Sequence, residues 1–161
     1  MEPVEEQAVA SSTRAREAYF VDFAEAMRRE VSIPLMVTGG LRRLDAMNMA
    51  LETGCADMIG IGRPLCVVTD APAKLLSGLE ELPRFEDQLS LLPRGLGFLN
   101  RIKVVRTISA FATQYWFYEQ IAALGRQGET NVSMGVMSAT TAQTKAAKAW
   151  LAARSELLES A

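Results

Sequence analysis

The feature that most constrains this chain is a pair of short apolar runs that each carry glycine at the end, at 34–40 (PLMVTGG) and 56–65 (ADMIGIGRPL). Buried parallel strands are short apolar runs of this kind, and glycine at their ends lets a ligand or another backbone approach closely. Between the runs, residues 41–53 have helical spacing, with Leu44, Met47 and Leu51 on one face, and Gly54 suits a left-handed helix cap. We therefore predict a strand, a helix and a second, parallel strand.

Glycines at the carboxyl ends of two consecutive parallel strands are typical of the phosphate-binding loops that follow the seventh and eighth strands of a TIM barrel. The backbone N–H groups of Gly39, Gly40, Gly62 and Arg63 would point toward an anion there, and the Arg63 guanidinium would add a charge-assisted contact. Glycine matters because a Cβ would hold the anion away from the backbone. Two alternatives stay open: the glycines only make tight turns, or the chain comes from an unrelated phosphate-binding barrel.

Three segments resemble the Old Yellow Enzyme family of NADH:flavin oxidoreductases: 12–20 (STRAREAYF), 33–42 (IPLMVTGGLR) and 57–65 (DMIGIGRPL). Residues 115–125 (YWFYEQIAALG) are similar to the helix that closes many bacterial members. The resemblance extends over nearly the whole chain and implies an eight-stranded barrel that holds FMN noncovalently. Carried over by position, it makes Gly39 with Gly40 one phosphate-binding pair, and Gly62 with Arg63 the other.

The resemblance also implies an activity, the reduction of an activated C=C bond by hydride that passes from NAD(P)H to the flavin. In the family a His-Asn or His-His pair holds the substrate carbonyl, and a tyrosine commonly supplies the proton. This chain has no histidine, and Tyr19, Tyr115 and Tyr118 lie in segments with helical patterns rather than in the matched strands. We therefore assign no catalytic residue.

The chain has 161 residues, whereas a complete barrel typically needs about 250. We expect an α/β chain, the C-terminal part of a TIM barrel with two parallel strands and flanking helices, plus a helical C-terminal extension. The expected divisions are a partial FMN-binding barrel at 1–82, a linker at 83–100 and the extension at 101–161. Missing barrel strands would make this chain a fragment that contributes the FMN phosphate site.

A short helix is expected between Asp70 and Gly78, and helical periodicity predicts three longer helices. The first spans 13–31 with an apolar stripe of Tyr19, Phe23 and Met27 that would pack on the outside of the barrel. The second spans 102–124 and ends at Gly125, and its four consecutive aromatic residues at 115–118 surround the helix, so that burial is needed on more than one side. Packing against the barrel is preferred for these aromatics over a dimer contact. The third helix spans 141–158.

Composition narrows the possible partners. The formal charge is −2, and no basic face dominates, so we expect no nucleic-acid partner. The acidic N-terminus and the lack of a long apolar run predict no secretory signal and no membrane span, with the cytoplasm as the default location.

Cys55 and Cys66 lack metal-ligand spacing and are expected to be buried thiols rather than a disulfide or metal site.

Two parallel strands alone leave two unpaired sheet edges. We expect the chain to self-associate through those edges, to pair with a complementing chain that carries the missing strands, or to be loosely folded. Three functions remain open: an FMN-dependent oxidoreductase segment that is active only with the rest of a barrel, a non-catalytic phosphate- or flavin-binding module, and an inactive truncated remnant that acts only in assembly.

Overall fold

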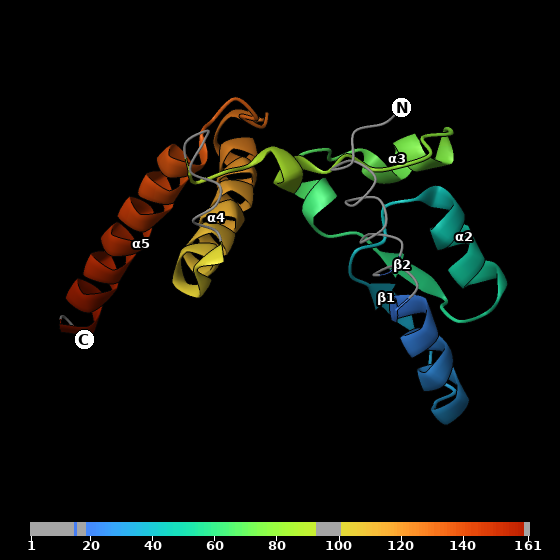
Figure 1. Ribbon diagram of the computed structural model, residues 1–161. Helices are drawn as coiled ribbons and strands as arrows, with labels where there is room; N and C mark the ends of the chain where they lie inside the picture. Colours follow the sequence, from blue (N-terminus) through green and yellow to red (C-terminus); the bar gives the residue numbers. More distant parts are fainter. Residues whose placement is uncertain (1–14, 16–18, 93–100, 160–161) are drawn as a thin grey trace. The chain divides into compact units, whose positions relative to one another are not determined.

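The computed structural model describes residue 15 and residues 19–92 and 101–159 (Figure 1). The chain divides into two compact units, Met1–Pro83 and Arg84–Ala161. Most of the resembling segment at 12–20, the start of the helix expected from residue 13, and residues 93–100 of the expected linker lie outside the described residues.

The first unit contains the predicted strand, helix and strand. Residues 19–30 are helical, and they are followed by β1 (Met36–Thr38), α2 (Leu44–Glu52) and β2 (Met58–Gly60). The two strands are parallel, and Met36 pairs with Met58 while Thr38 pairs with Gly60. Helix α2 ends before Gly54, whose φ of 72° lies in the left-handed region that a glycine cap adopts easily. The α/β class with two parallel strands is thus confirmed.

The first unit continues through η1 (Arg63–Cys66) and α3 (Ala71–Leu76) and then returns to the segment before α2. Arg43 forms an antiparallel bridge with Glu81, and the Leu82 N–H donates to the Arg42 carbonyl at 2.9 Å. Because Arg43 is extended in this bridge, α2 begins at Leu44 and not at residue 41, where the helical spacing begins.

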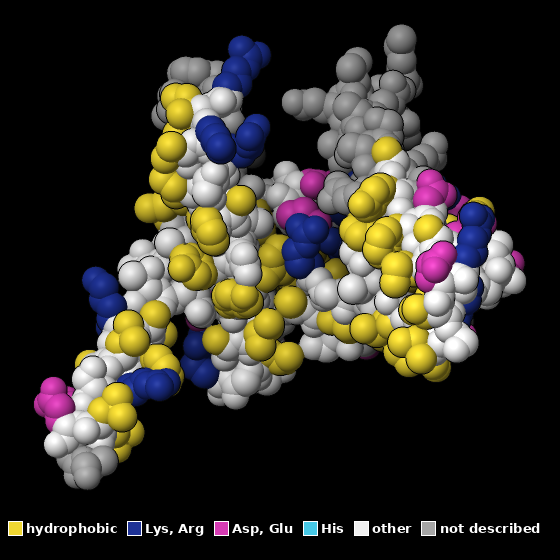
Figure 2. All heavy atoms as spheres, turned by 90° about the horizontal axis from the view of Figure 1, so that it is seen from below, with side chains coloured by type: hydrophobic (Ala, Val, Ile, Leu, Met, Phe, Trp, Pro, Cys, Tyr) yellow, Lys and Arg dark blue, Asp and Glu magenta, His cyan; other side chains and the backbone are white. Residues whose placement is uncertain are grey.

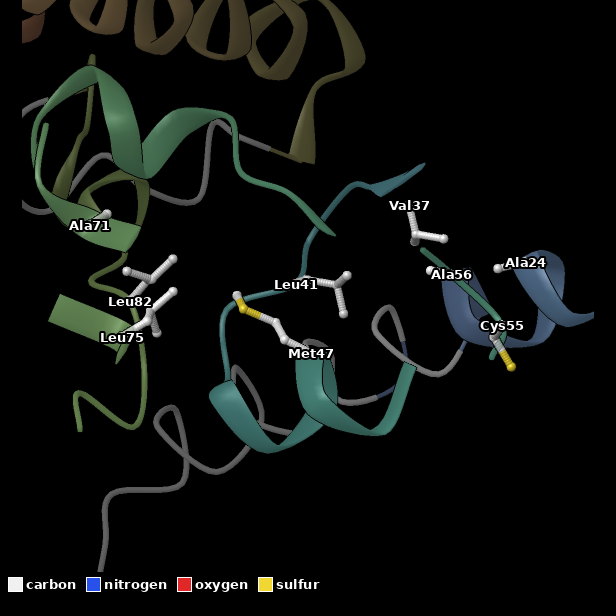
Figure 3. Packing of buried hydrophobic residues seen from close by; sticks show 9 residues of the cluster. All are labelled: Ala24, Val37, Leu41, Met47, Cys55, Ala56, Ala71, Leu75 and Leu82. Atoms are coloured by element: carbon white, nitrogen blue, oxygen red, sulfur yellow. The ribbon is translucent and has the colours of Figure 1, made fainter. Parts of the chain in front are cut away.

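A cluster of buried apolar side chains holds the first unit together, as Figure 3 shows. Its residues are Ala24, Val37, Leu41, Met47, Cys55, Ala56, Ala71, Leu75 and Leu82. The side chain of Leu82 is fully buried, and Leu41 lies between the residues near the strands and those near α3 (Figure 3). Side chains from helix, strand and loop segments therefore meet in one core.

The apolar stripe expected on the first helix is not the face that packs into this core. Tyr19, Phe23 and Met27 are 63%, 56% and 37% exposed, whereas Ala24 is 3% exposed and Phe20 packs against the cluster. The small side chain of Ala24 lets the helix lie close to the sheet, and the larger side chains flank that contact. Figure 2 shows hydrophobic side chains gathered on the surface of both units.

The second unit consists of η2 (Phe85–Gln88), α4 (Lys103–Gln127) and α5 (Val136–Glu159), and α4 and α5 pack side by side (Figure 1). The predicted end of α4 at Gly125 is wrong, because the helix continues to Gln127 and Gly128 adopts a left-handed φ of 77°. The Gly128 N–H donates to the Leu124 carbonyl at 2.9 Å, which closes the last turn. Helix α5 begins at Val136, ahead of the predicted residue 141.

The aromatic run of α4 is half buried within the second unit itself. Trp116 and Phe117 are 1% and 3% exposed, the Trp116 indole N–H donates to the Met134 carbonyl at 2.7 Å, and the Trp116 ring stacks on Phe85. Tyr115 and Tyr118 remain exposed on the other side of the helix. The three tyrosines at 19, 115 and 118 all lie on helices, as predicted from the helical patterns.

Buried polar side chains join α4 to the segments that follow it. The Gln120 amide exchanges two hydrogen bonds with the Asn131 backbone, at 2.8 and 3.0 Å. The Glu119 carboxylate accepts from Arg126 and from the Gln143 amide of α5. The wide separation of these partners in sequence explains why a pattern of apolar spacing does not reveal them.

No described helix of either unit combines the length and the apolar content needed to span a membrane.

Candidate functional site

The four residues expected to bind an anion follow the two strands at the same edge of the sheet. Thr38, the last residue of β1, is paired with Gly60, the last residue of β2. Gly39 and Gly40 follow β1 directly, and Gly62 and Arg63 come two and three residues after the end of β2. Because neighbouring strands lie about 4.8 Å apart, the two loops begin side by side.

Gly39 and Gly40 turn the chain sharply away from β1, with φ values of 120° and 82°. Residues with a side chain rarely adopt such values. A Cβ on Gly39 would also lie 2.6 Å from Cζ of Phe20, which is closer than real Cβ contacts. The fold itself therefore requires glycine at residue 39, whatever the loop binds.

Gly62 has a different environment. It is exposed, its φ is −100°, and a Cβ added to it would meet no atom within 4 Å. Its carbonyl accepts a hydrogen bond from the Leu65 N–H at 2.9 Å, which starts η1. Nothing in the packing demands glycine here, so the open backbone at residue 62 is compatible with the close approach of a ligand.

Gly60 was not singled out from the sequence as a residue of special role. A Cβ at Gly60 would lie 2.8 Å from the Cβ of Thr38, its partner on the neighbouring strand. The glycine therefore allows the side chain of Thr38 to lie across the end of β2. A glycine inside a strand is the usual signal of such a close approach.

A second arrangement that the sequence did not reveal fixes the opposite end of the sheet. Arg28 of the first helix pairs with Asp57, and its guanidinium also donates to the carbonyls of Gly54 and Ile33 at 3.0 and 3.2 Å. The Asp57 carboxylate accepts from the Leu35 N–H at 2.7 Å. The pKa of Asp57 lies below its ordinary value, mainly because of the hydrogen bond from Arg28 and to a smaller extent because of the hydrogen bond from the Leu35 N–H. Arg28 and Asp57 therefore tie the helix to both strands.

The remaining chemistry near the site is limited. Arg63 is exposed and brings a positive charge beside Gly62. Both cysteines are free thiols; Cys55 is buried as expected, whereas Cys66 is only half-buried. Burial raises the pKa of the Cys66 thiol. Among the residues that the structure describes, no group of three or more cysteine, aspartate or glutamate side chains could hold a metal ion, and the sequence lacks histidine. The groups that this edge offers to an anion are the open backbone at Gly62 and the Arg63 guanidinium.

Comparison with known proteins supports a relationship over part of the chain. A curated protein of Talaromyces variabilis named NADH-dependent flavin oxidoreductase iccE is 27% identical over 114 residues, which cover 70% of this chain and 28% of that protein. Proteins named NADH-dependent flavin oxidoreductase iliE are 40% identical over 62 residues in a Neonectria species and 42% identical over 52 residues in Hypocrea jecorina. Those matches cover 38% and 32% of this chain, and 8% and 13% of the two proteins.

The chain thus spans less than a third of the length of these curated relatives. No protein-family model and no solved structure matches it. The names of these relatives nevertheless agree with the family resemblance that the sequence segments carry. The resemblance of this chain to a part of the NADH:flavin oxidoreductases is therefore confirmed.

Proposed function

We propose that this chain supplies the phosphate-binding part of the FMN site of an NAD(P)H-dependent flavin oxidoreductase. The observation that carries this proposal is the placement of two glycine-bearing loops at one edge of a parallel strand pair, with a cation at the second loop. Similarity to proteins named NADH-dependent flavin oxidoreductase supports the flavin and the nicotinamide reductant. The strand pair and its helices would then be the last two βα units of a TIM barrel.

The residues at this edge fit a phosphate group. The exposed backbone at Gly62 has room for an anion, because no atom lies within 4 Å of the position that a Cβ would occupy. The Gly39 and Gly40 turn would present its backbone from the neighbouring strand, and Arg63 would pair with the phosphate charge. Bound FMN would supply hydride transfer, and the chain's own role would be to hold and orient the cofactor by its phosphate.

We assign no catalytic residue to this chain. The sequence contains no histidine, and the tyrosines lie on helices rather than on the strand ends that carry the glycines. Reduction of an activated alkene would therefore require groups from other barrel strands. Such strands would come from a complementing polypeptide or a longer protein, and they would also contact the flavin ring.

A non-catalytic function is the second candidate, and the lack of histidine favours it. In that case the chain would be a phosphate- or flavin-binding module without chemistry, or a truncated remnant that acts only in assembly. Phosphate binding without reductase activity would support the module, and the lack of both would support the remnant.

Titration of FMN with the purified chain, followed by quenching of flavin fluorescence, tests the proposal. The Arg63→Ala variant should weaken binding by about 1.5–3 kcal/mol, the usual contribution of a hydrogen bond to a charged group, or roughly 10- to 150-fold in Kd. Gly62→Ala should also weaken binding, because its Cβ would enter the space left for the anion while meeting no protein atom.

Gly125→Ala is a matched control for these variants. Residue 125 lies within α4 in the other unit, and a Cβ there would also meet no atom within 4 Å. We expect unchanged FMN binding in this control and unchanged circular dichroism in all three variants. Saturable binding that Gly62→Ala and Arg63→Ala leave intact would contradict the assignment of the phosphate to this edge.

A further inference from the structure

The face of the sheet that turns away from the core carries Thr38 at the end of β1. Side chains alternate between the two faces along a strand, and Val37 points into the core, where it is 8% exposed. Met36 and Thr38 therefore lie on the opposite face, and both are exposed. The position that a Cβ on Gly60 would take is 3.0 Å from the Thr38 Oγ1 and 3.5 Å from the Met36 Sδ. These distances place the Thr38 hydroxyl beside the end of β2.

The same hydroxyl lies between the starts of the two glycine loops. Thr38 directly precedes Gly39, and Gly60, which the Thr38 side chain lies across, comes two residues before Gly62. Because threonine is branched at Cβ, few χ1 rotamers are open to it, and the hydroxyl has few alternative positions. The strand therefore holds a polar group at the edge where both loops begin.

The Thr38 hydroxyl is available to a ligand. It is exposed and makes no hydrogen bond with any residue that the structure describes. Five threonines on helices or at a helix end donate instead to the carbonyl four residues earlier, namely Thr53, Thr107, Thr140, Thr141 and Thr144. In an extended strand that carbonyl lies too far away to accept such a bond. The position of Thr38 on a strand thus leaves its donor free.

We propose that the Thr38 hydroxyl donates a hydrogen bond to the phosphate of FMN, in addition to the contacts of the glycine loops and Arg63. This inference rests on the proposed function and adds a binding residue to the same site. A threonine O–H is a donor, and a charged phosphate oxygen is a strong acceptor. Gly60 then has a role distinct from that of the loop glycines, because a Cβ there would displace the Thr38 side chain.

The alternative is that Thr38 only suits a strand. Threonine is common in strands because a branched side chain packs well on a pleated surface, and valine has the same property. Thr38→Val keeps the branched shape and removes only the hydroxyl. Thr38→Ser keeps the hydroxyl and removes the methyl group, so it is the matched control at the same position. Because residue 38 is exposed, neither change removes a contact of the core.

Titration of the unmodified chain and both variants with FMN, with riboflavin and with inorganic phosphate as a competitor tests the proposal. Thr38→Val should weaken the binding of FMN and of inorganic phosphate about tenfold, the loss expected for one hydrogen bond to a charged group. Its affinity for riboflavin should not change, because riboflavin lacks the phosphate. Thr38→Ser should bind FMN as the unmodified chain does, and circular dichroism should be the same for all three proteins.

The outcomes separate this inference from the proposed function. If the unmodified chain does not bind FMN, or binds FMN and riboflavin equally, both are overturned. If the unmodified chain prefers FMN and Thr38→Val retains the full preference, the phosphate site stands and the role of the hydroxyl is overturned. An equal loss of affinity for FMN and riboflavin in Thr38→Val would also overturn it, because the hydroxyl would then act on a part that the two flavins share.

Discussion

Replacement of Gly39 by alanine should destabilise the first unit strongly, even in the absence of any ligand. The backbone of Gly39 has a φ of 120°, and holding a residue with a side chain in such a region costs about 1–3 kcal/mol. The new Cβ would also lie 2.6 Å from Cζ and 2.9 Å from Cε2 of Phe20, so the end of this half-buried ring would have to shift, which adds less than the backbone strain does. The expected loss is therefore about 1–3 kcal/mol, set mainly by the backbone.

Urea denaturation followed by circular dichroism measures this change in the free energy of unfolding. Gly62→Ala is the matched control, because its Cβ meets no atom within 4 Å and its φ is −100°. We expect the control to change the free energy by less than about 0.5 kcal/mol. In a Phe20→Ala background, Gly39→Ala should still cost the backbone part of the loss, because the φ of residue 39 stays in the left-handed region. Equal stability of Gly39→Ala and Gly62→Ala would refute the reasoning.

Two carboxylates give further predictions about stability and pH. The Arg28 hydrogen bond holds the pKa of Asp57 below its ordinary value of 3.8 in the folded chain. The contribution of Asp57 to stability is therefore fully present above pH 3.8 and is lost as the pH falls through the lower pKa of the folded chain. Asp57→Asn should therefore lower the melting temperature at neutral pH and reduce the fall of the melting temperature as the pH is lowered. An unchanged fall of the melting temperature at acid pH would argue against the ion pair. At Glu119 burial alone would raise the pKa, but Arg126 and Gln143 together lower it. Gln143→Ala should destabilise the pairing of α4 with α5, and an unchanged urea midpoint for the helical signal would contradict that role.

The strand, helix and strand could be predicted because their signals are local. Apolar runs that end in glycine and a helical pattern between them fix the order of elements, and a parallel pairing follows from the intervening helix. The glycines at 39 and 62 look alike in the sequence, however. Only the fold distinguishes Gly39, which is required by its φ and by Phe20, from Gly62, which has open space around it.

Contacts between distant residues explain what the sequence did not reveal. Arg28 and Asp57 are 29 residues apart, and nothing in either local pattern marks them as a pair. The sequence predicts the end of α4 at Gly125 because a glycine there is a reasonable cap, but Gly128 serves as the cap instead. Which of the two glycines ends the helix depends on how far along its sequence α4 stays helical.

Comparison of FMN with riboflavin is the measurement that tests the central claim most directly, because the two flavins differ only in the phosphate. If the glycine loops and Arg63 hold the phosphate, the chain will bind FMN saturably, inorganic phosphate will displace it, and riboflavin will bind much more weakly. Equal binding of the two flavins, or binding that phosphate does not displace, would contradict a phosphate site at this edge of the sheet.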